Sequence, residues 1–366
     1  MGKYFEIKNL SVGYRKKKVI SDINADIEKG SVLSLIGPNG AGKSTILKSI
    51  IKAIPVLEGN IFIDGKDIYE ISLKEMSKKL SVVLTDRISP EIMTCAEIVA
   101  MGRYPYTNMI GHLTDEDKKQ VLNALKKVHA EKLSGKYFTE ISDGEKQMIM
   151  LARAICQKPE IIILDEPTAY LDINHKIEFL SILRKMARED NVTVIMSLHE
   201  IDLASKISDY LMCISDGKVK CFGKTEDIIS KDIISELYGL NSGAYNNVLG
   251  SLEFKCKKGP PEIFIISGNG KGIPFYRALQ KRDIPFAAGI LFENDIDCIV
   301  ASSITDNVIS TPAFEDVSKI TLEKAKEEIS KCKYIICAGV KISSHNKFIQ
   351  ELIDFSKANN KTILYY

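Results

Sequence analysis

A glycine-rich segment near the start of the chain has the residue types and the spacing that bind phosphate. It fits the pattern GxxxxGK[ST], with an apolar, β-prone run at 31–36 before it and a helical pattern at 45–53 after it. Glycines allow backbone amides to close around phosphates, Lys43 adds a positive charge, and the Ser44 hydroxyl is a ligand for Mg²⁺. The predicted phosphate-binding residues are Gly37, Pro38, Asn39, Gly40, Ala41, Gly42, Lys43, Ser44 and Thr45.

Two adjacent acidic residues end a second apolar strand, predicted at 161–164. Asp165 is placed to hold Mg²⁺ through water, and Glu166 is placed to orient or deprotonate a water molecule that attacks a phosphate. Two acids could also simply end a strand. The phosphate-binding segment upstream favours the catalytic interpretation.

A second turn with serine and glycine lies between these two segments, at Ile141-Ser142-Asp143-Gly144-Glu145. It opens a predicted helix that continues with Lys146-Gln147-Met148. The turn therefore offers a second set of backbone amides and a hydroxyl to phosphate, although one chain already supplies the first set.

In order and spacing, these motifs resemble those of the ATP-binding cassette (ABC) ATPases over about residues 3–240. The resemblance implies that ATP and Mg²⁺ are sandwiched between two copies of the chain, with the second turn acting as the signature that contacts the ATP of the other copy. It also implies that Asp172, in the D-loop, reaches across the dimer interface and that His199 contacts the γ-phosphate. Lys43, Glu166 and His199 are then the catalytic residues. Tyr14 falls where the family places an aromatic that stacks on adenine, although a core-packed tyrosine is an alternative.

Two motifs depart from the family pattern. The signature usually reads LSGGQ, whereas here Asp143 replaces a glycine and Glu145 replaces the glutamine. We expect Ser142 and Gly144 to keep the contact with phosphate, but an added acid near ATP could weaken binding unless it points to solvent.

The Q-loop glutamine, which in the family helps to bind Mg²⁺ and couples the site to a partner, is also missing. Thr85 occupies the matching position and Asp86 follows it. Either side chain could substitute for the glutamine.

The motifs need a sheet to position them. Apolar runs at 161–164 and 192–196 alternate with helical patterns, which predicts a parallel sheet buried on both faces. Residues 1–30 are predicted to form paired strands, and 97–130 to contain two helices. The expected fold class is α/β: a mixed sheet with a phosphate-loop core, an antiparallel β subdomain and a helical subdomain at about 90–160, which together form an ABC domain over 1–245.

A segment with several Gly and Pro residues, 246–260, is predicted to be a linker. After it, 261–366 is expected to form a small Rossmann-like α/β domain. Its predicted strands are 262–267, 286–291, 298–302, 334–338 and 362–366, and its predicted helices are 274–282, 321–331 and 345–358. The run Gly268-Asn269-Gly270-Lys271-Gly272 could bring backbone close to a phosphate or a corrinoid side chain, or could be only a tight turn.

Composition limits the possible classes of protein. The 366 residues are enough for about two domains, and a net charge of +2 gives no indication of nucleic-acid binding. Eight cysteines form no CxxC pair, no apolar run approaches the ~20 residues that span a bilayer, and the N-terminus lacks a signal-peptide core. We therefore expect a chain on the cytoplasmic face of the membrane that needs separate membrane partners.

The run Gly102-Arg103-Tyr104-Pro105 resembles importer ATPases for iron-siderophore, haem and vitamin B12 uptake, where this region cradles a coupling helix of the permease. An ordinary helix end stopped by Pro105 is the alternative. Residues 263–291 resemble an extension found on some cobalamin importer ATPases. The predicted function is ATP hydrolysis by a homodimer, coupled to uptake of an iron chelate or a corrinoid. The predicted partners are permease subunits and, indirectly, an extracytoplasmic solute-binding protein, with no nucleic acid.

Two other interpretations stay open. The chain could be a soluble ABC ATPase that acts on nucleic acid, ribosomes or cluster assembly instead of transport. Residues 255–366 could also be a sensory domain that slows transport when the cargo accumulates.

Overall fold

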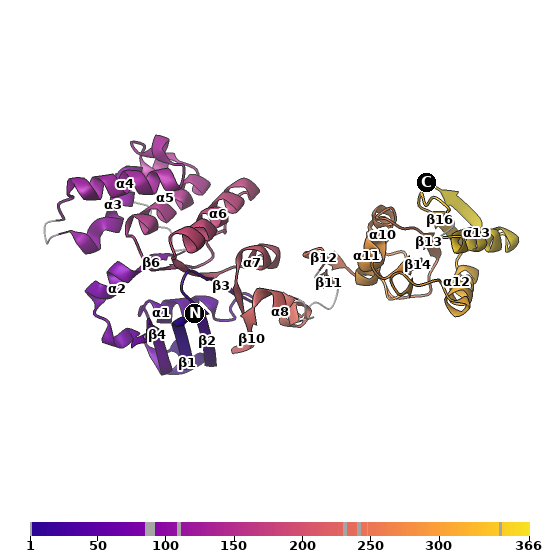
Figure 1. The fold of residues 1–366 in the computed structure, drawn as a ribbon, viewed down its shortest axis with the longest axis horizontal. Coiled ribbons are helices and arrows are strands. Elements are labelled where there is room, and N and C mark those ends of the chain that lie inside the picture. Colours follow the sequence, from indigo (N-terminus) through magenta and orange to yellow (C-terminus); the bar gives the residue numbers. More distant parts are fainter. Residues whose placement is uncertain are drawn as a thin grey trace. The chain divides into compact units, whose positions relative to one another are not determined.

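The structure is a computed structural model that describes residues 2–84, 92–107, 111–229, 233–239, 243–246, 248–343 and 346–366. Contacts divide the chain into two compact units, Met1–Ile233 and Ile234–Tyr366 (Figure 1). Each unit has its own sheet and is described by itself.

The first unit is built on one mixed sheet of ten strands in the order β5-β4-β1-β2-β10-β9-β3-β8-β7-β6. Strands β1, β2, β4 and β5 pair antiparallel, whereas β6, β7, β8, β3 and β9 pair parallel with one another. Strand β10 is antiparallel to β9 and parallel to β2. The bounds are β1 Lys3–Tyr14, β2 Lys17–Glu28, β3 Val32–Ile36, β4 Val56–Ile63, β5 Lys66–Asp67, β6 Leu80–Val83, β7 Ile161–Leu164, β8 Thr193–Ser197, β9 Tyr210–Ser215 and β10 Lys218–Lys224.

Strands β3, β7 and β8 are buried along their whole length, as their apolar sequences predict for a sheet covered on both faces. Within this unit, α3, α4 and α5 pack on one another as a helical subdomain (Figure 1). The α-helices are α1 Lys43–Ile50, α2 Leu73–Lys79, α3 Cys95–Ala100, α4 Asp115–Lys127, α5 Asp143–Cys156, α6 Ile173–Glu189, α7 Ile201–Ile207, α8 Thr225–Ile229 and α9 Ile233–Leu237, of which α9 crosses the division between the units. The 3₁₀ helices are η1 Ile68–Glu70, η2 Met101–Tyr106, η3 Glu131–Leu133 and η4 Phe138–Glu140.

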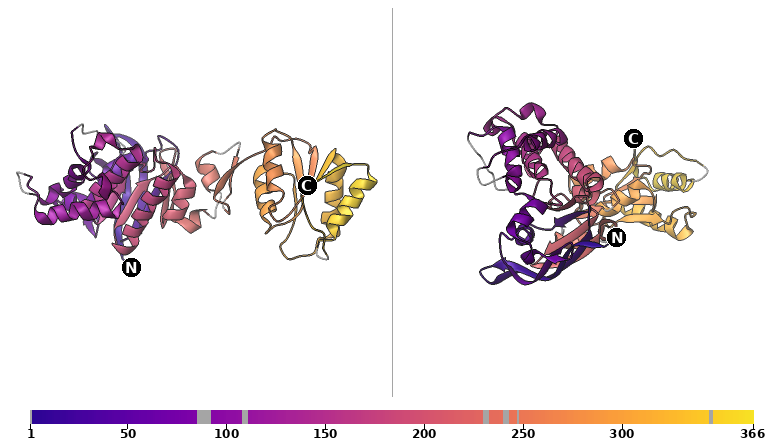
Figure 2. Two further views of the ribbon diagram at one scale, coloured as in Figure 1. Left: turned by 90° about the horizontal axis from the view of Figure 1, so that it is seen from above. Right: turned by 60° about the vertical axis from the view of Figure 1, so that its left-hand side comes forward.

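The second unit contains a five-stranded parallel sheet in the order β15-β14-β13-β16-β17. Helices cover both faces of this sheet (Figure 2), α10 and α11 packing in one hydrophobic cluster and α12 and α13 in another. A two-stranded hairpin precedes it. The bounds are β11 Gly243–Asn246, β12 Ser251–Phe254, β13 Ile263–Ile266, α10 Ile273–Gln280, β14 Phe286–Phe292, α11 Ile296–Ile304, β15 Val308–Thr311, α12 Lys319–Lys331, β16 Tyr334–Cys337, α13 Phe348–Ala358 and β17 Thr362–Tyr365.

The strand predicted at 298–302 is wrong, because this segment lies in helix α11. The side chain of Asp295 caps the helix by accepting a hydrogen bond from the backbone N–H of Asp297. A short buried apolar run cannot be assigned to a strand or a helix from periodicity alone. The actual strand, β15, begins four residues after the helix ends and was not predicted.

The segment predicted as a linker, 246–260, contains strand β12, which pairs with β11. The side-chain amide of Asn246 donates to the Ile299 carbonyl and to Ser303 Oγ, both on α11. The hairpin therefore packs on α11, within the second unit.

Candidate functional site

The phosphate-binding segment connects β3 to α1, and two of its glycines have no room for a side chain. A Cβ on Gly37, whose φ is +146°, would lie 2.0 Å from the Ile214 carbonyl oxygen of β9. A Cβ on Gly42, at φ +102°, would lie 2.6 Å from Cδ1 of Ile20 on β2. The loop can therefore pack against the sheet only with glycine at both positions.

Lys43 is the first residue of α1 and is buried. Its ammonium donates hydrogen bonds to the carbonyl oxygens of Gly37, at 2.7 Å, and Pro38, at 3.0 Å. Burial lowers the pKa of Lys43, and the nearby carboxylates of Glu166 and Asp165 partly oppose this shift. The cation is thus held inside the loop that is predicted to surround a triphosphate.

Oxygen atoms from three elements meet at the carboxyl end of β7. The hydroxyl of Ser44 donates to Oδ1 of Asp165 at 3.0 Å, and the hydroxyl of Ser197 donates to the same oxygen at 2.7 Å. The backbone N–H of Glu166 in turn donates to Ser197 Oγ at 2.8 Å. A carboxylate beside a hydroxyl is a donor set that suits Mg²⁺, so the residues present fit this ion.

Sequence reasoning missed Ser197. The position of Ser197 could have indicated its role, because it is the last residue of β8 and β8 pairs in parallel with β7. Carboxyl ends of neighbouring parallel strands lie at the same edge of a sheet.

Glu166 and His199 contact each other, with His199 Nε2 lying 2.6 Å from Glu166 Oε1. Both side chains are about one-third exposed, so water can reach them. Glu166 has φ +47°, a left-handed conformation that is uncommon for residues other than glycine. Strained backbone of this kind concentrates at functional sites.

The predicted signature forms the N-terminus of α5, with Ser142 as its cap. The Glu145 carboxylate accepts hydrogen bonds from the backbone N–H of Ser142, at 2.8 Å, and from its hydroxyl, at 2.9 Å. These bonds hold the pKa of Glu145 below its usual range. Glu145 thus turns back onto Ser142, while Asp143 forms an exposed ion pair with Lys146.

Asp172 lies at the start of α6 and contacts the signature through a histidine. Its carboxylate accepts a hydrogen bond from the backbone N–H of His175, at 2.9 Å, and lies 2.9 Å from His175 Nδ1. A Cβ on Gly144 would lie 3.2 Å from the same imidazole ring. His175, which was not predicted from the sequence, therefore lies between Asp172 of the D-loop and Gly144 of the signature.

The remaining predicted residues lie near these groups or outside the described part of the chain. Tyr14 ends β1, pairs with Lys17 of β2 and is 46% exposed, so its ring is accessible for stacking. Thr45 is buried in the first turn of α1. Thr85 and Asp86 lie outside the residues that the structure describes.

Comparison with known proteins decides the family. Residues 20–169 match the ABC transporter family, and residues 286–366 match a second family, MJ0874. The ABC transporter ATP-binding protein MJ0873 of Methanocaldococcus jannaschii is 43% identical over 287 residues, covering 78% of this chain and 98% of that protein. The chain belongs to the ABC transporter ATP-binding proteins. This ABC ATPase uses ATP with Mg²⁺, as predicted, and its fold class is confirmed.

Other relatives of this ABC ATPase are importer subunits. The iron(3+)-hydroxamate import ATP-binding protein FhuC of Bacillus subtilis is 31% identical, covering 64% of this chain and 87% of that protein. The cobalamin import ATP-binding protein BtuD of Halobacterium salinarum is 27% identical, covering 87% and 82%. The ABC ATPase is therefore of the importer type. Within its described residues, no helix has the length and apolar character needed to cross a membrane.

Solved structures give the same fold. A metal-chelate type ABC transporter in an inward-facing conformation matches with a TM-score of 0.58 and 27% identity, covering 64% of this chain and 89% of that one. The dimeric cassette MJ0796 bound to ADP and Pi matches with a TM-score of 0.54 and 26% identity, covering 60% and 98%.

Proposed function

We propose that the ABC ATPase works as a homodimer in which the signature of each copy completes the ATP site of the other, and that ATP turnover drives a membrane importer. One observation carries the dimer proposal. Ser142 is exposed, and its hydroxyl and backbone N–H bond Glu145 within the same turn instead of the phosphate loop at 37–44. The second set of phosphate ligands therefore faces outward, where another copy can reach it.

The surface beside the signature also suits a second copy. Tyr170, Ile173 and Ile177 are 79%, 75% and 55% exposed, and they flank Asp172 at the start of α6. Exposed apolar side chains that lie close together mark interaction sites. The proposed dimer buries them next to the ATP.

Each residue of the site has a part in hydrolysis. The Glu166 carboxylate orients the attacking water, and His199 both positions Glu166 and donates to the γ-phosphate. Lys43 stabilises the charge that develops on the phosphate oxygens, helped by the Ser142 hydroxyl and the Gly144 backbone amide of the other copy. Ser44 and Asp165 hold Mg²⁺, which neutralises charge on the phosphates.

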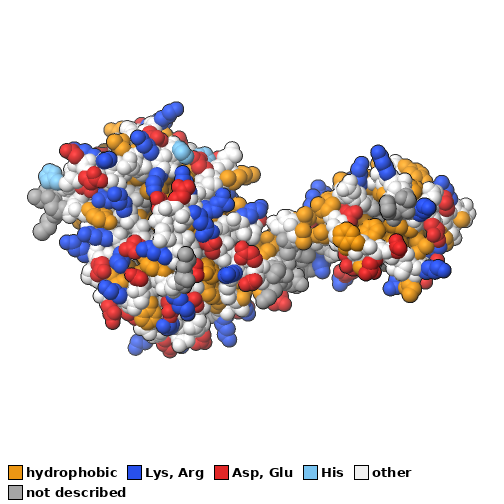
Figure 3. All heavy atoms as spheres, in the orientation of Figure 1, with side chains coloured by type: hydrophobic (Ala, Val, Ile, Leu, Met, Phe, Trp, Pro, Cys, Tyr) orange, Lys and Arg blue, Asp and Glu red, His pale blue; other side chains and the backbone are white. Residues whose placement is uncertain are grey.

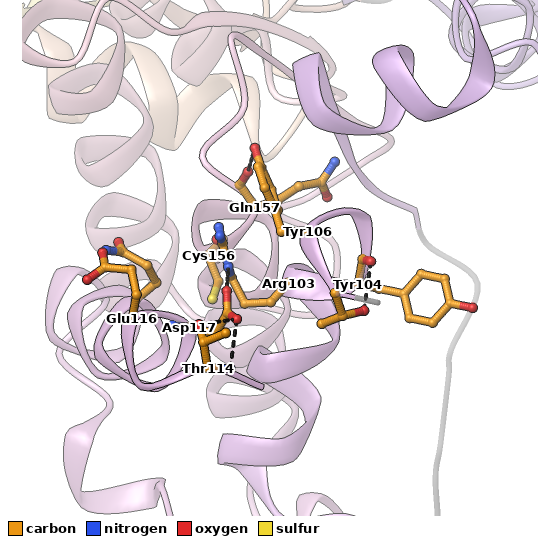
Figure 4. A network of polar contacts seen from close by, with 10 residues as sticks. Arg103, Tyr104, Tyr106, Thr114, Glu116, Asp117, Cys156 and Gln157 are labelled. Carbon is orange, nitrogen blue, oxygen red and sulfur yellow. Dashed lines mark hydrogen bonds and ion pairs between the residues drawn. The ribbon is translucent and has the colours of Figure 1, made fainter. Parts of the chain in front are cut away.

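A network of polar contacts in the helical subdomain holds η2, the element that we propose contacts the permease (Figure 4). Arg103 is buried, pairs with Asp117 at 2.8 Å, donates to the Cys156 carbonyl at 2.9 Å and lies over the ring of Tyr106. These contacts fix η2 on α4 and α5. In Figure 4, Tyr104 points away from the network. The residue is 78% exposed.

We infer that Tyr104 and its neighbours on η2 receive the permease at the cytoplasmic face of the membrane. The iron-chelate and cobalamin names of the relatives make these cargoes the proposed substrates of the importer. Nucleic acid is not a proposed partner, since the net charge is +2 and basic and acidic side chains are interspersed on the face of the first unit in Figure 3.

The dimer is tested with Glu166→Gln, which removes the carboxylate that orients water but keeps the shape of the side chain. We expect this variant to persist as a dimer in ATP and Mg²⁺ during size-exclusion chromatography, whereas Glu189→Gln, an exposed change at the far end of α6, behaves like the parent. A Glu166→Gln protein that stays monomeric at saturating ATP contradicts the proposal.

Coupling to transport is tested by purification from detergent-solubilised membranes. Recovery of a hydrophobic permease with the parent, and its loss with Tyr104→Ala, supports import. Recovery of nucleic acid or ribosomes instead supports the alternative of an ATPase that is not coupled to transport.

A further inference from the structure

A cavity in the second unit opens at one edge of its parallel sheet. Its volume is about 550 Å³, and small-molecule sites occupy roughly 300–1,000 Å³. Residues from three segments line it: 267–271 after β13, 290–295 at the end of β14, and 339–341 with 346–349 after β16. All three leave the carboxyl ends of parallel strands.

The cavity lies where the connections of the sheet change sides. After β13 the chain passes into α10, which packs in one hydrophobic cluster, whereas after the adjacent β16 it passes into α13, which packs in the other. Figure 2 shows helices on both faces of this sheet. Loops that diverge from neighbouring strands leave a crevice, and open parallel sheets bind ligands there.

Two lysines from different loops line the cavity. Lys271 comes from the loop after β13, and Lys341 comes from the loop after β16. Among the described residues, neither ammonium has a hydrogen-bond or ion-pair partner. Lys271 reaches the opposite wall, since its Nζ lies 3.5 Å from the position of a Cβ on Gly339, a residue at φ +61°.

Part of the lining is polar, from Ser267, Asn269, Asp295 and Asn346, and another part is apolar and partly aromatic. The rings of Phe292 and Phe348 meet edge to face with centroids 6.3 Å apart. Ile290, Leu291, Val340 and Ile349 also line the cavity. A flat ring can pack on such a wall, because aromatic side chains provide large, rigid contact areas.

Two backbone amides of the glycine-rich loop at 268–272 are already hydrogen-bonded within the protein. The N–H of Asn269 donates to both carboxylate oxygens of Asp295, at 2.9 and 3.1 Å. The N–H of Gly272 donates to both oxygens of Asp297, each at 3.1 Å. These amides are therefore unavailable to cradle a pyrophosphate, and recognition of an anion depends on the two lysines.

We propose that this cavity is a second ligand site, separate from the ATP site, and that it binds a nucleotide with a single phosphate group. The base packs against the apolar wall, and the phosphate lies between Lys271 and Lys341. The proposal does not depend on dimer formation or on transport.

Isothermal titration calorimetry of the full chain tests the site, with AMP as the probe. All proteins carry Lys43→Ala to weaken binding at the phosphate loop. We expect saturable AMP binding, weakened about tenfold or more by Lys271→Ala and by Lys341→Ala, because each removes a charged hydrogen-bond donor. Lys324→Ala, an exposed change on α12 away from the cavity, is the matched control and should leave binding unchanged.

Two further probes test which groups are recognised. Adenosine lacks the phosphate and ribose 5-phosphate lacks the base, so each should bind more weakly than AMP. Absence of AMP binding at millimolar concentration overturns the proposal, as does equal AMP affinity in the Lys271→Ala, Lys341→Ala and Lys324→Ala proteins. The lysines are exposed, so melting temperatures of the variants should match and exclude unfolding as the cause.

Discussion

Replacing Glu145 with glutamine should strengthen ATP-dependent dimer formation. In each copy, the Glu145 carboxylate accepts hydrogen bonds from the backbone N–H and the hydroxyl of Ser142, and the proposed dimer presents this hydroxyl to the γ-phosphate of its partner. ATP must therefore displace an anion from the Ser142 hydroxyl. Glutamine can keep the capping arrangement without the charge.

The size of the effect follows from these hydrogen bonds. A bond to a charged group contributes about 1.5–3 kcal/mol and a neutral one about 0.5–1.5 kcal/mol, so displacing glutamine costs about 1–1.5 kcal/mol less per site. A symmetric dimer has two such sites and gains about 2–3 kcal/mol. The dimer dissociation constant should fall roughly 30- to 150-fold.

Sedimentation equilibrium at several ATP concentrations measures this constant, with Glu166→Gln in every protein to prevent turnover. Asp143→Asn is the matched control, because it removes a charge from the same turn without touching Ser142, and its exposed ion pair is worth about 0.2–1 kcal/mol. Equal dimerisation of Glu145→Gln and the parent refutes the proposed competition. Failure of every protein to dimerise refutes the dimer itself.

Three further outcomes are expected from the site and the helical subdomain. The pKa of Asp117 is about 2, below its ordinary value because Thr114 and Arg103 bind the carboxylate, so the ionised form stabilises the fold by about 2 kcal/mol above pH ~4. This contribution should be lost as the pH falls towards 2, and the difference in urea stability between the parent and Asp117→Asn should shrink with it. Ser197→Ala should weaken ATP-Mg²⁺ binding and lower kcat, because Asp165 and the Glu166 amide lose a shared partner; unchanged steady-state kinetics would count against this role. Gly37→Ala should abolish binding of fluorescent ATP, since its Cβ would overlap the backbone of β9; retained affinity would show that the loop can move away.

Much of the ATP site could be predicted because its motifs are local. The phosphate loop needs glycines, a lysine and a serine within one strand-turn-helix, and Asp165 and Glu166 follow directly from an apolar strand. In the second unit, most strands and helices were predicted from their apolar patterns. The exceptions are α11, where a short buried run suits a helix and a strand equally well, strand β15 after it, and the hairpin β11–β12.

Sequence by itself determined the family-specific order of the motifs and the alternation of strands and helices, since both depend on neighbours along the chain. Tertiary structure alone decided that Ser197 joins Asp165 and that His175 joins Asp172 to Gly144. It also decided that Glu145 folds back on Ser142 and that Lys271 reaches across a cavity. The physical reason is that strand pairing and side-chain rotamers place these groups, and neither is encoded in local spacing.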